Sequence, residues 1–474
     1  MVYETAEVHG GHELVLKSAM TTVKPALPMH EYRLPLSNLD LLLPALDVSV
    51  FFCYRHPAPT ASELKEALAK VLVAYYPLAG EVLANAAGEP ELLCSGRGVD
   101  FVEATADGSQ LQEVRLALPD ESAEKLVPAK KAGVISVQVT KFKCGGALVG
   151  CTFDHRVCDA YSFNMFLVAW AIASRGGTAP PAPFFDRSIV APRDPSPRTY
   201  TTDALIDRLF SPLSSVPLPS ASATATAINR IYHVAADDVA TLHALAGAGR
   251  TKLEAFTAHL WQLCSMAASG HQRLCCMGMV VDGRARMFPD GAMKAYFGNV
   301  AMTLADVADD VHRWVREAAT GEHFRGLIDW VEALRPKPAV ARAYLGGTGG
   351  SEAMACIVSS GMGFPVGEAD FGTGLPAFAS YHFPWPADTG YIMPMPSARG
   401  DGDWVVYVHT VPELVKVMEE GHVIVMLLDR QLHLLIWSLC ASVDRFAFPV
   451  PPATSLAATL LLKINTLCQV YAVL

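Results

Sequence analysis

Apolar and polar residues follow clear patterns around the middle of the first half of the chain. Residues 134–142, VISVQVTKF, alternate between apolar and polar types, which predicts a β-strand. Residues 147–153, ALVGCTF, form a continuous apolar run, which predicts a buried strand joined to the first by a hairpin at Gly145 and Gly146. Residues 159–174 are apolar nearly all round and predict a helix that is buried on several sides. The residues between the second strand and this helix therefore lie at a strand end, where α/β folds expose chemistry.

The same alternation of strands and helices continues along the chain. Residues 60–77 and 251–268 each begin with a T-x-x-E capping box and continue with apolar residues at helical spacing, so both predict helices. In the second half, residues 228–234 and 273–284 read as strands, and residues 304–319 are expected to form a helix. Mixed strands and helices of this kind indicate an α/β protein.

The length of the chain favours two domains, because 474 residues exceed what one ordinary core accommodates. Residues 196–226 are rich in proline and small polar residues and predict a crossover linker. We therefore expect an N-terminal domain at 1–195 and a C-terminal domain at 227–422. Residues 423–474 are rich in Leu, Val and Ala, follow no clear period, and form an atypical tail.

Composition narrows the class of protein. A hydrophobic fraction of 51% with 18% charged residues indicates a well-packed globular protein. The net charge of -10 and the lack of a dense Lys/Arg run exclude a nucleic-acid binder of the usual basic kind. The eleven cysteines contain no CxxC pair, so we expect no metal site, and free thiols suit a reducing, cytoplasmic compartment. The N-terminus is polar rather than a signal peptide, and no charge-free apolar run is long enough to predict a membrane span.

Two histidines are each followed by an aspartate at the fourth position: His155 with Asp159, and His233 with Asp237. A neutral imidazole is the usual side chain for removing a proton from an alcohol or amine near neutral pH. Asp237 begins a predicted helix, where a carboxylate stabilises free N–H groups, so a structural role accounts for the second pair. His155 lies among charged residues between two buried elements, which favours a functional site there. The spacing alone leaves a structural His155 open.

Several segments, in order along the chain, resemble the plant BAHD acyltransferases. FDHRVCDAYSFNMF (153–166) resembles the HxxxD motif of that family, and EADFGTGLPAF (368–378) resembles its DFGWG motif. The resemblance covers about residues 15–420. Further matching segments are PLSNLDLLLP (35–44), YYPLAGEV (75–82), FDRSIVAPRDP (185–195), EAFTAHLW (254–261), VVDGRARM (280–287) and YFGNV (296–300).

This resemblance implies an α/β fold of two similarly sized chloramphenicol-acetyltransferase-like domains, with mixed sheets and a solvent channel between them. It implies transfer of an acyl group from coenzyme A to an alcohol or amine, with acyl-coenzyme A as co-substrate and no permanently bound cofactor. His155 would be the general base in the channel, without an acyl-enzyme intermediate. Asp159 would be structural and pair with Arg284, with Arg286 as the second candidate partner.

The resemblance also implies structural roles for Asp370, Phe371, Gly372 and Gly374, near the coenzyme A mouth of the channel. Position 373 departs from the family, because Thr373 stands where the family has tryptophan. If this position is buried, the smaller side chain loses roughly 3 kcal/mol or more of stability.

Coenzyme A carries phosphates that require cations or helix N–H groups. Thr251 and Lys252 begin a predicted helix and are candidates for this contact, with a solvated lysine as the alternative. Ser359 and Ser360 precede the DFGTG segment and are candidates for the pantetheine arm, with ordinary turn serines as the alternative.

Likeness to the members that acylate with hydroxycinnamoyl groups or act on coniferyl alcohol favours a hydroxycinnamoyl donor, with acetyl as the alternative. The expected acceptor is shikimate, quinate, a phenylpropanoid alcohol or an amine, and the expected state is a monomer. Thr373 and the tail at 423–474 motivate a second hypothesis, a non-catalytic relative that binds thioesters or a protein partner. The tail is either an altered reading of the 3′ end of the gene or a real extra helical element.

Overall fold

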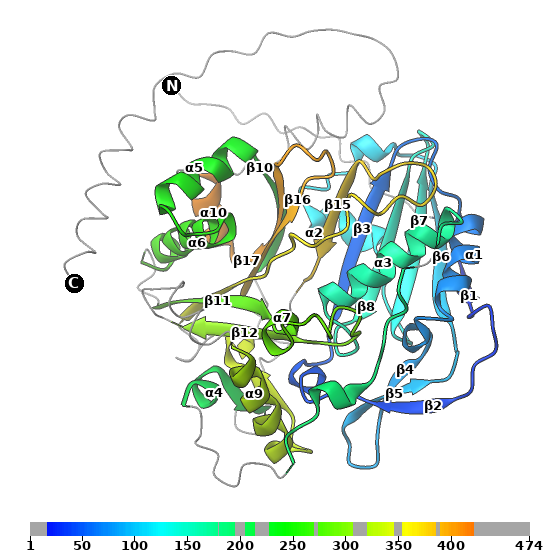
Figure 1. The fold of residues 1–474 in the computed structure, drawn as a ribbon. Coiled ribbons are helices and arrows are strands. Elements are labelled where there is room, and N and C mark those ends of the chain that lie inside the picture. The colour runs from blue at the N-terminus through cyan, green and yellow to red at the C-terminus, as the bar shows by residue number, and fades with distance from the viewer. Residues whose placement is uncertain are drawn as a thin grey trace, which may run out of the picture.

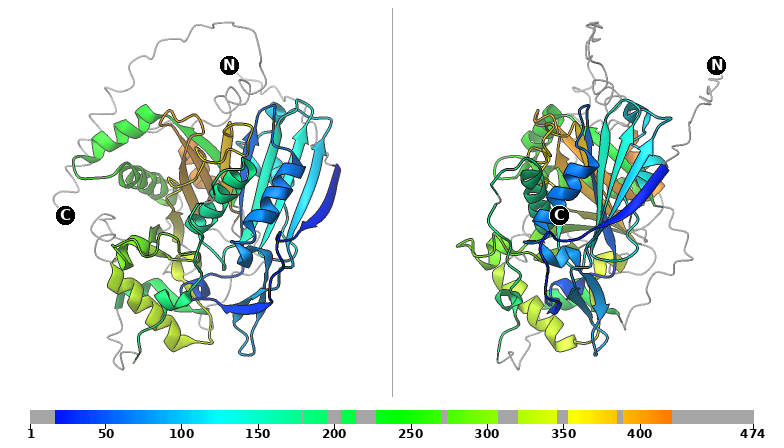
Figure 2. Two further views of the ribbon diagram at one scale, coloured as in Figure 1. Left: turned by 45° about the vertical axis from the view of Figure 1, so that its right-hand side comes forward. Right: turned by 90° about the vertical axis from the view of Figure 1, so that its right-hand side faces the viewer.

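The protein consists of two mixed sheets that lie side by side with helices on their outer faces (Figures 1 and 2). Each sheet has six strands within the residues that the structure describes. No helix among those residues is long and apolar enough to cross a membrane. The predicted tail lies outside them. The computed structural model describes residues 17–178, 180–194, 204–213, 227–269, 274–306, 320–345, 353–384 and 389–420.

The first sheet contains the predicted hairpin. Strands β7 and β8 pair antiparallel, and Gly145 in their turn has a φ of +79°, a conformation that favours glycine. Strand β15 pairs antiparallel with β3, so a strand from the second half of the chain completes this sheet. In sheet order the strands are β1 (Lys17–Val23), β6 (Val99–Ala106), β7 (Ile135–Phe142), β8 (Ala147–Asp154), β3 (Asp47–Tyr54) and β15 (Phe378–His382).

The second sheet is covered on both faces. Along β17, Val406 and Val408 pack into a core with the helices on the outer face, whereas Val405 and Tyr407 belong to a core shared with the first sheet. Because side chains alternate between the faces of a strand, this strand joins the two halves through one of its faces. In sheet order the strands are β10 (Ile228–Val234), β17 (Trp404–Thr410), β16 (Gly390–Pro396), β14 (Ala353–Val358), β11 (Leu274–Asp282) and β12 (Ala301–Asp306).

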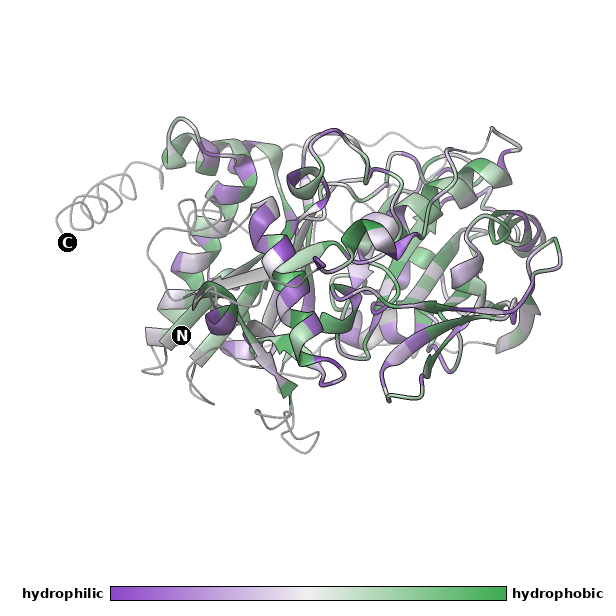
Figure 3. Cartoon of the chain, turned by 60° about the horizontal axis from the view of Figure 1, so that its bottom comes forward, coloured by the Kyte–Doolittle hydropathy of each residue, from purple (hydrophilic) through white to green (hydrophobic). Residues whose placement is uncertain are grey.

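Figure 3 shows hydrophilic and hydrophobic residues together on most helices, whereas α3 is apolar nearly all round. Helices α1 and α3 pack against each other beside the first sheet, and α6 packs between the second sheet and helices α5 and α10. Both predicted capping boxes are present, at Thr60 and Thr251. The helices are α1 (Ala61–Val71), α2 (Pro119–Leu126), α3 (Ala160–Ser174), α4 (Ala204–Leu209), α5 (Ala236–Ala246), α6 (Lys252–Ser269), α7 (Arg284–Met287), α9 (Gly321–Leu334) and α10 (Pro412–Glu419).

Two predictions need correction. The helix expected at 304–319 is wrong at its start, because residues 304–306 belong to β12 and pair with β11; the remainder lies outside the described residues. Tertiary pairing outweighed the local helical spacing here. Part of the expected linker is ordered, since residues 204–213 form α4 and β9 and bury apolar side chains against α9.

Two small sheets complete the described fold. The first contains β2 (Tyr32–Pro35), β5 (Pro90–Cys94) and β4 (Glu81–Ala84), and the second contains β13 (Ala339–Ala341) and β9 (Phe210–Pro212).

A buried histidine in β15 predicts a pH-dependent stability. His382 is 1% exposed, and neither ring nitrogen has a hydrogen-bond partner among the described residues. Burial lowers the pKa of His382 from 6.5 to about 4. Between these two pKa values the unfolded chain takes up a proton that the folded chain does not, so acidification destabilises the fold by about 3 kcal/mol.

The substitution His382→Phe is therefore expected to flatten the loss of unfolding free energy as the pH falls from 6.5 to about 4. Urea unfolding across this range measures the effect. At pH 8 the ring is neutral in both states, so that condition serves as the control. If the unfolding free energy of the variant depends on pH as that of the wild type does, His382 is not the source of this dependence.

Candidate active site

A pocket of about 720 Å³ lies between the two halves, along the N-terminal part of α3. One wall is α3 itself, and the opposite wall is formed by the ends of β11 and β12 and by residues 294–299. A third side is the loop at 359–368, which precedes the DFGTG segment. The aromatic lining residues are Tyr75, Tyr161, Tyr344, Phe364, Tyr381 and Tyr391.

His155 lines this pocket. It follows directly after β8 and lies five positions before α3, as the apolar pattern predicts. The side chain is half-buried. Its backbone is held at both ends: the N–H donates to the carbonyl of Leu46 at 3.0 Å, and the carbonyl accepts from Nδ2 of Asn299 at 2.9 Å. Its Nδ1 is buried and has no hydrogen-bond partner among the described residues.

The charged neighbours of His155 pair with each other. Arg156 donates to the buried carboxylate of Asp154 through Nε at 2.9 Å and Nη2 at 2.6 Å, and Lys130 lies 3.8 Å from the same carboxylate. These ion pairs account for the charges that the sequence concentrates around His155. Asp154 and Arg156 do not line the pocket, whereas His155 does.

Asp159 does not orient His155. Its carboxylate accepts from Nη1 of Arg284 at 2.8 Å and from Nη2 at 3.0 Å. Two backbone N–H groups also donate to it, those of Ser162 at 3.0 Å and Val300 at 3.1 Å. The first of these caps α3. The pairing expected between Asp159 and Arg284 is therefore present, and the carboxylate is fully occupied.

This ion pair is shielded from water, since Asp159 and Arg284 are each 5% exposed. Burial raises the pKa of Asp159, but the charge and hydrogen bonds of Arg284 outweigh it and hold that pKa below its usual value. The ring of Tyr161 covers the guanidinium at 4.3 Å. Arg286, the second candidate, instead donates to the backbone carbonyl of Asp282.

The sequence did not reveal two further residues of this network, Asp40 and Asn299. Asn299 lines the pocket and donates to Asp40 and to the carbonyl of His155. Both residues lie in segments that match the family, but nothing in their local pattern indicates a long-range contact.

The DFGTG segment packs against the first half of the chain. Phe371 is buried and makes an edge-on contact with Trp170 at 4.8 Å between ring centroids. Oδ1 of Asp370 accepts from the N–H groups of Gly372 and Gly374 at 2.8 and 2.9 Å. Both glycines have φ near +100°, where other residues are strained. Within the described residues, the pocket lining includes Glu368 but not Asp370, Phe371, Gly372 or Gly374.

Thr373 is half-buried, and its Oγ1 is buried without a hydrogen-bond partner among the described residues. The family tryptophan is therefore replaced by a residue that contributes an unpaired hydroxyl to a partly buried site.

The residues proposed for coenzyme A fall into two places. Ser359 and Ser360 line the pocket. Thr251 and Lys252 are exposed at the start of α6, and neither lines the pocket. In the described part of the chain, no cluster of His, Cys, Asp and Glu side chains is arranged to hold a metal ion.

The second His–Asp pair has a different environment. His233 is buried and its Nε2 lies 2.8 Å from Oδ2 of Asp403, which also accepts from Arg399. Asp237 lies in the first turn of α5. His233 does not line the pocket, so its contacts are those of a structural residue.

Comparison with known proteins identifies the class to which this two-sheet fold belongs. The profile of the Transferase family matches residues 15–422. Hydroxycinnamoyltransferase of Narcissus pseudonarcissus is 30% identical over 425 residues, with 81% of this chain and 93% of the relative covered. Putrescine hydroxycinnamoyltransferase 1 of Oryza sativa subsp. japonica is 32% identical, and the alignment covers 82% of this chain and 93% of the relative. Shikimate O-hydroxycinnamoyltransferase of Nicotiana tabacum is 28% identical, and the alignment covers 84% of this chain and 97% of the relative.

Solved structures share the fold. Vinorine synthase aligns with a TM-score of 0.63 at 19% identity, covering 85% of this chain and 96% of that one. F. sporotrichioides TRI101, complexed with coenzyme A and T-2, aligns with a TM-score of 0.67 at 16% identity. The alignment covers 82% of this chain and 98% of that one. The chain belongs to the Transferase family, the BAHD acyltransferases, and has their two-domain α/β fold. It is an acyltransferase.

The buried ion pair yields a first prediction for the site. Arg284→Met leaves the Asp159 carboxylate buried without its cation, so the free energy of unfolding should fall by about 3–5 kcal/mol. Adding Asp159→Asn to this variant should recover part of the loss, because the amide is neutral and still caps α3. Urea unfolding at neutral pH measures both effects.

Arg286→Met is the matched control, since Arg286 lies on the same short helix but is exposed. We expect it to cost less than about 1 kcal/mol. If the two arginine variants lose equal stability, the Asp159–Arg284 pair is not the source of the effect.

The unpaired hydroxyl of Thr373 yields a second prediction. Thr373→Val keeps the shape of the side chain and removes the unpaired group, so the free energy of unfolding should rise by about 1 kcal/mol. Thr320→Val is the control, because the Thr320 hydroxyl accepts from the N–H of His323 and caps α9. That variant should lose about 1 kcal/mol. Thermal unfolding distinguishes the two, and destabilisation by Thr373→Val would contradict the prediction.

Proposed function

We propose that the protein transfers a hydroxycinnamoyl group from coenzyme A to an alcohol, with His155 as the general base. The observation that carries this proposal is the half-buried imidazole of His155 in a pocket of about 720 Å³ between the two halves. Family membership supports the use of an acyl-coenzyme A donor, and TRI101 of the same fold is known in complex with coenzyme A.

The proposed reaction runs through Nε2 of His155, because Nδ1 is buried. The imidazole removes the proton of the acceptor hydroxyl as its oxygen attacks the thioester carbonyl. The tetrahedral oxyanion then collapses, the carbon–sulfur bond breaks, and the coenzyme A thiolate leaves and takes up the proton. No acyl-enzyme forms in this proposal, so the reaction needs no nucleophilic serine or cysteine.

The lining supports a planar aromatic acyl group over acetyl. Tyr75, Phe364, Tyr381 and Tyr391 all face the pocket, and aromatic side chains bind flat rings through stacked and edge-on contacts. The relatives named as hydroxycinnamoyltransferases agree with this choice.

The acceptor is proposed to be an alcohol such as shikimate, quinate or a phenylpropanoid alcohol. The guanidinium of Arg284 is already bound by Asp159 and Asp282, so Lys294 is the lining cation left for an acidic acceptor. The carboxylate of Glu368 also lines the pocket and favours the alternative, an amine acceptor. A relative named for putrescine supports this alternative.

The remaining site assignments are part of the same proposal. Thr251 and Lys252 would contact coenzyme A phosphate, and Ser359 and Ser360 the pantetheine arm. Structural roles are proposed for Asp159, Arg284, Asp370, Phe371, Gly372 and Gly374. We further propose a monomer of two domains, at 1–195 and 227–422. A cytoplasmic location is supported by the free cysteines of the described residues.

The test is a panel of p-coumaroyl-, caffeoyl- and acetyl-coenzyme A against shikimate, quinate, coniferyl alcohol and putrescine, with thiol release followed over time. We expect turnover with a hydroxycinnamoyl donor and an alcohol. His155→Ala should lower kcat by about 10²–10⁴-fold, the usual contribution of a general base.

His233→Ala is the control, because that histidine is outside the pocket, and it should keep kcat when folded. Full activity in His155→Ala would refute the mechanism. Turnover with putrescine alone would identify an N-acyltransferase, and no turnover with any pair would favour the non-catalytic relative.

A further inference from the structure

Three consecutive residues of the second half, Gly298, Asn299 and Val300, contact the segment that carries His155. The carbonyl of Gly298 accepts from Nη2 of Arg284 at 2.9 Å and from the hydroxyl of Ser162 at 3.0 Å. The N–H of Val300 donates to Asp159 at 3.1 Å. These two residues hold the ion pair. Asn299, between them, reaches the histidine itself.

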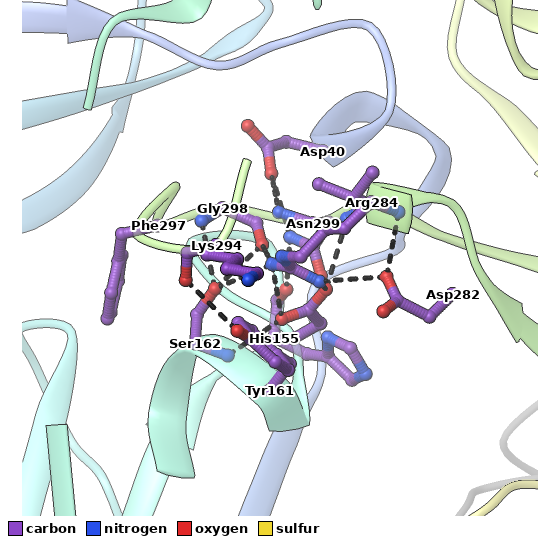
Figure 4. A network of polar contacts seen from close by, with 12 residues as sticks. Asp40, His155, Tyr161, Ser162, Asp282, Arg284, Lys294, Phe297, Gly298 and Asn299 are labelled. Carbon is purple, nitrogen blue, oxygen red and sulfur yellow. Dashed lines mark hydrogen bonds and ion pairs between the residues drawn. The ribbon is translucent and has the colours of Figure 1, made fainter. Parts of the chain in front are cut away.

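Asn299 is 1% exposed, and its amide hydrogens are fully used. Its backbone N and its Nδ2 each donate to Oδ1 of Asp40 at 2.8 Å. Nδ2 also donates to the carbonyl of His155 at 2.9 Å and lies 3.2 Å from that of Arg156 (Figure 4). With both Nδ2 hydrogens engaged, this side chain has no donor left for a developing oxyanion. Any effect of Asn299 on catalysis therefore acts through His155.

Asp40 fixes the orientation of Asn299. Its carboxylate is fully buried and also accepts from the N–H and the hydroxyl of Ser37, at 2.9 and 2.8 Å. Nε of Arg187 lies 3.5 Å from it. A carboxylate held this firmly determines which edge of the carboxamide faces it, and the other amide hydrogen then points to the carbonyl of His155.

The imidazole of His155 has no carboxylate to orient it. Asp159 is bound by Arg284, and Nδ1 of His155 has no partner among the described residues. The position of the ring then depends on its backbone, which is fixed by Leu46 at the N–H and by Asn299 at the carbonyl.

We propose that Asn299 is a positioning residue for His155: the Asp40–Asn299 pair holds the backbone carbonyl of the base and thereby sets the ring in the pocket. This inference rests on the proposed function, in which His155 is the general base. Displacement of a catalytic group by about 1 Å can lower a rate about 100-fold, so such a contact acts on kcat.

The chain offers a matched control in Asn229. This residue is 4% exposed and also donates through its backbone N and its Nδ2 to an aspartate of the first half, Asp120. Asn229 lies outside the pocket lining. Asn299→Ser and Asn229→Ser each remove a contact between Nδ2 of an asparagine and an aspartate of the first half, and serine leaves room for water to satisfy the carboxylate in each. Asn229→Ser also removes the contacts of Oδ1 with Tyr407 and His409, so it is the more disruptive of the two changes. Only the first variant also removes the contact with His155.

We expect Asn299→Ser to lower kcat by about 10- to 100-fold, with KM for both substrates changed less than about twofold. Asn229→Ser should keep kcat within about twofold, although it should lose at least as much thermal stability as Asn299→Ser because it removes more buried hydrogen bonds. A purely structural role for Asn299 would give equal kcat in the two variants and would overturn the proposal.

A second measurement does not depend on turnover. Diethyl pyrocarbonate modifies exposed histidine rings, and peptide mass spectrometry follows the rate at His155. This rate should change at least about threefold in Asn299→Ser, because the ring is then exposed differently to solvent. In Asn229→Ser it should remain at the wild-type value. Unchanged reactivity in Asn299→Ser would overturn the proposal. An inactive wild type would refute the proposed function, whereas this measurement would still test Asn299.

Discussion

The buried ion pair of Asp159 and Arg284 is the constraint on which the site depends. Asp159 begins α3 in the first half, and Arg284 begins α7 in the second, 125 positions later. Neither charge is stable in the interior without the other, so the two halves must meet at this point. The four hydrogen bonds donated to the Asp159 carboxylate fix both its position and its orientation. The pocket lies beside this contact because α3 forms one of its walls.

The same constraint separates His155 from the carboxylate four residues after it. At the start of a helix Asp159 accepts from the first turn of α3, and its remaining capacity is taken by Arg284. The His155 imidazole therefore differs in its surroundings from the histidine of a Ser–His–Asp arrangement, which is held by a carboxylate. The backbone of His155 is held instead, by Leu46 at the N–H and by Asn299 at the carbonyl.

Sequence reasoning succeeded where the signal is local. The hairpin of β7 and β8, the helix after it and the position of His155 between them all follow from spacing within about thirty residues. The pairing with Arg284 came from resemblance to a family, not from spacing. The contact between Asn299 and Asp40, 259 positions apart, has no local signature. Strand β12 was missed because its pairing with β11 outweighs the local helical spacing at residues 304–306. The ordering of α4 was missed because its partner α9 is distant in sequence.

The DFGTG loop shows how a family motif can lose its largest side chain and keep its shape. Asp370 closes the turn by accepting from two backbone N–H groups, and the glycines at 372 and 374 supply the positive φ angles that this turn requires. Phe371 anchors the loop by packing on Trp170 and Tyr54. None of these contacts involves the side chain at position 373. These contacts therefore do not require a tryptophan at position 373, and Thr373 leaves them in place.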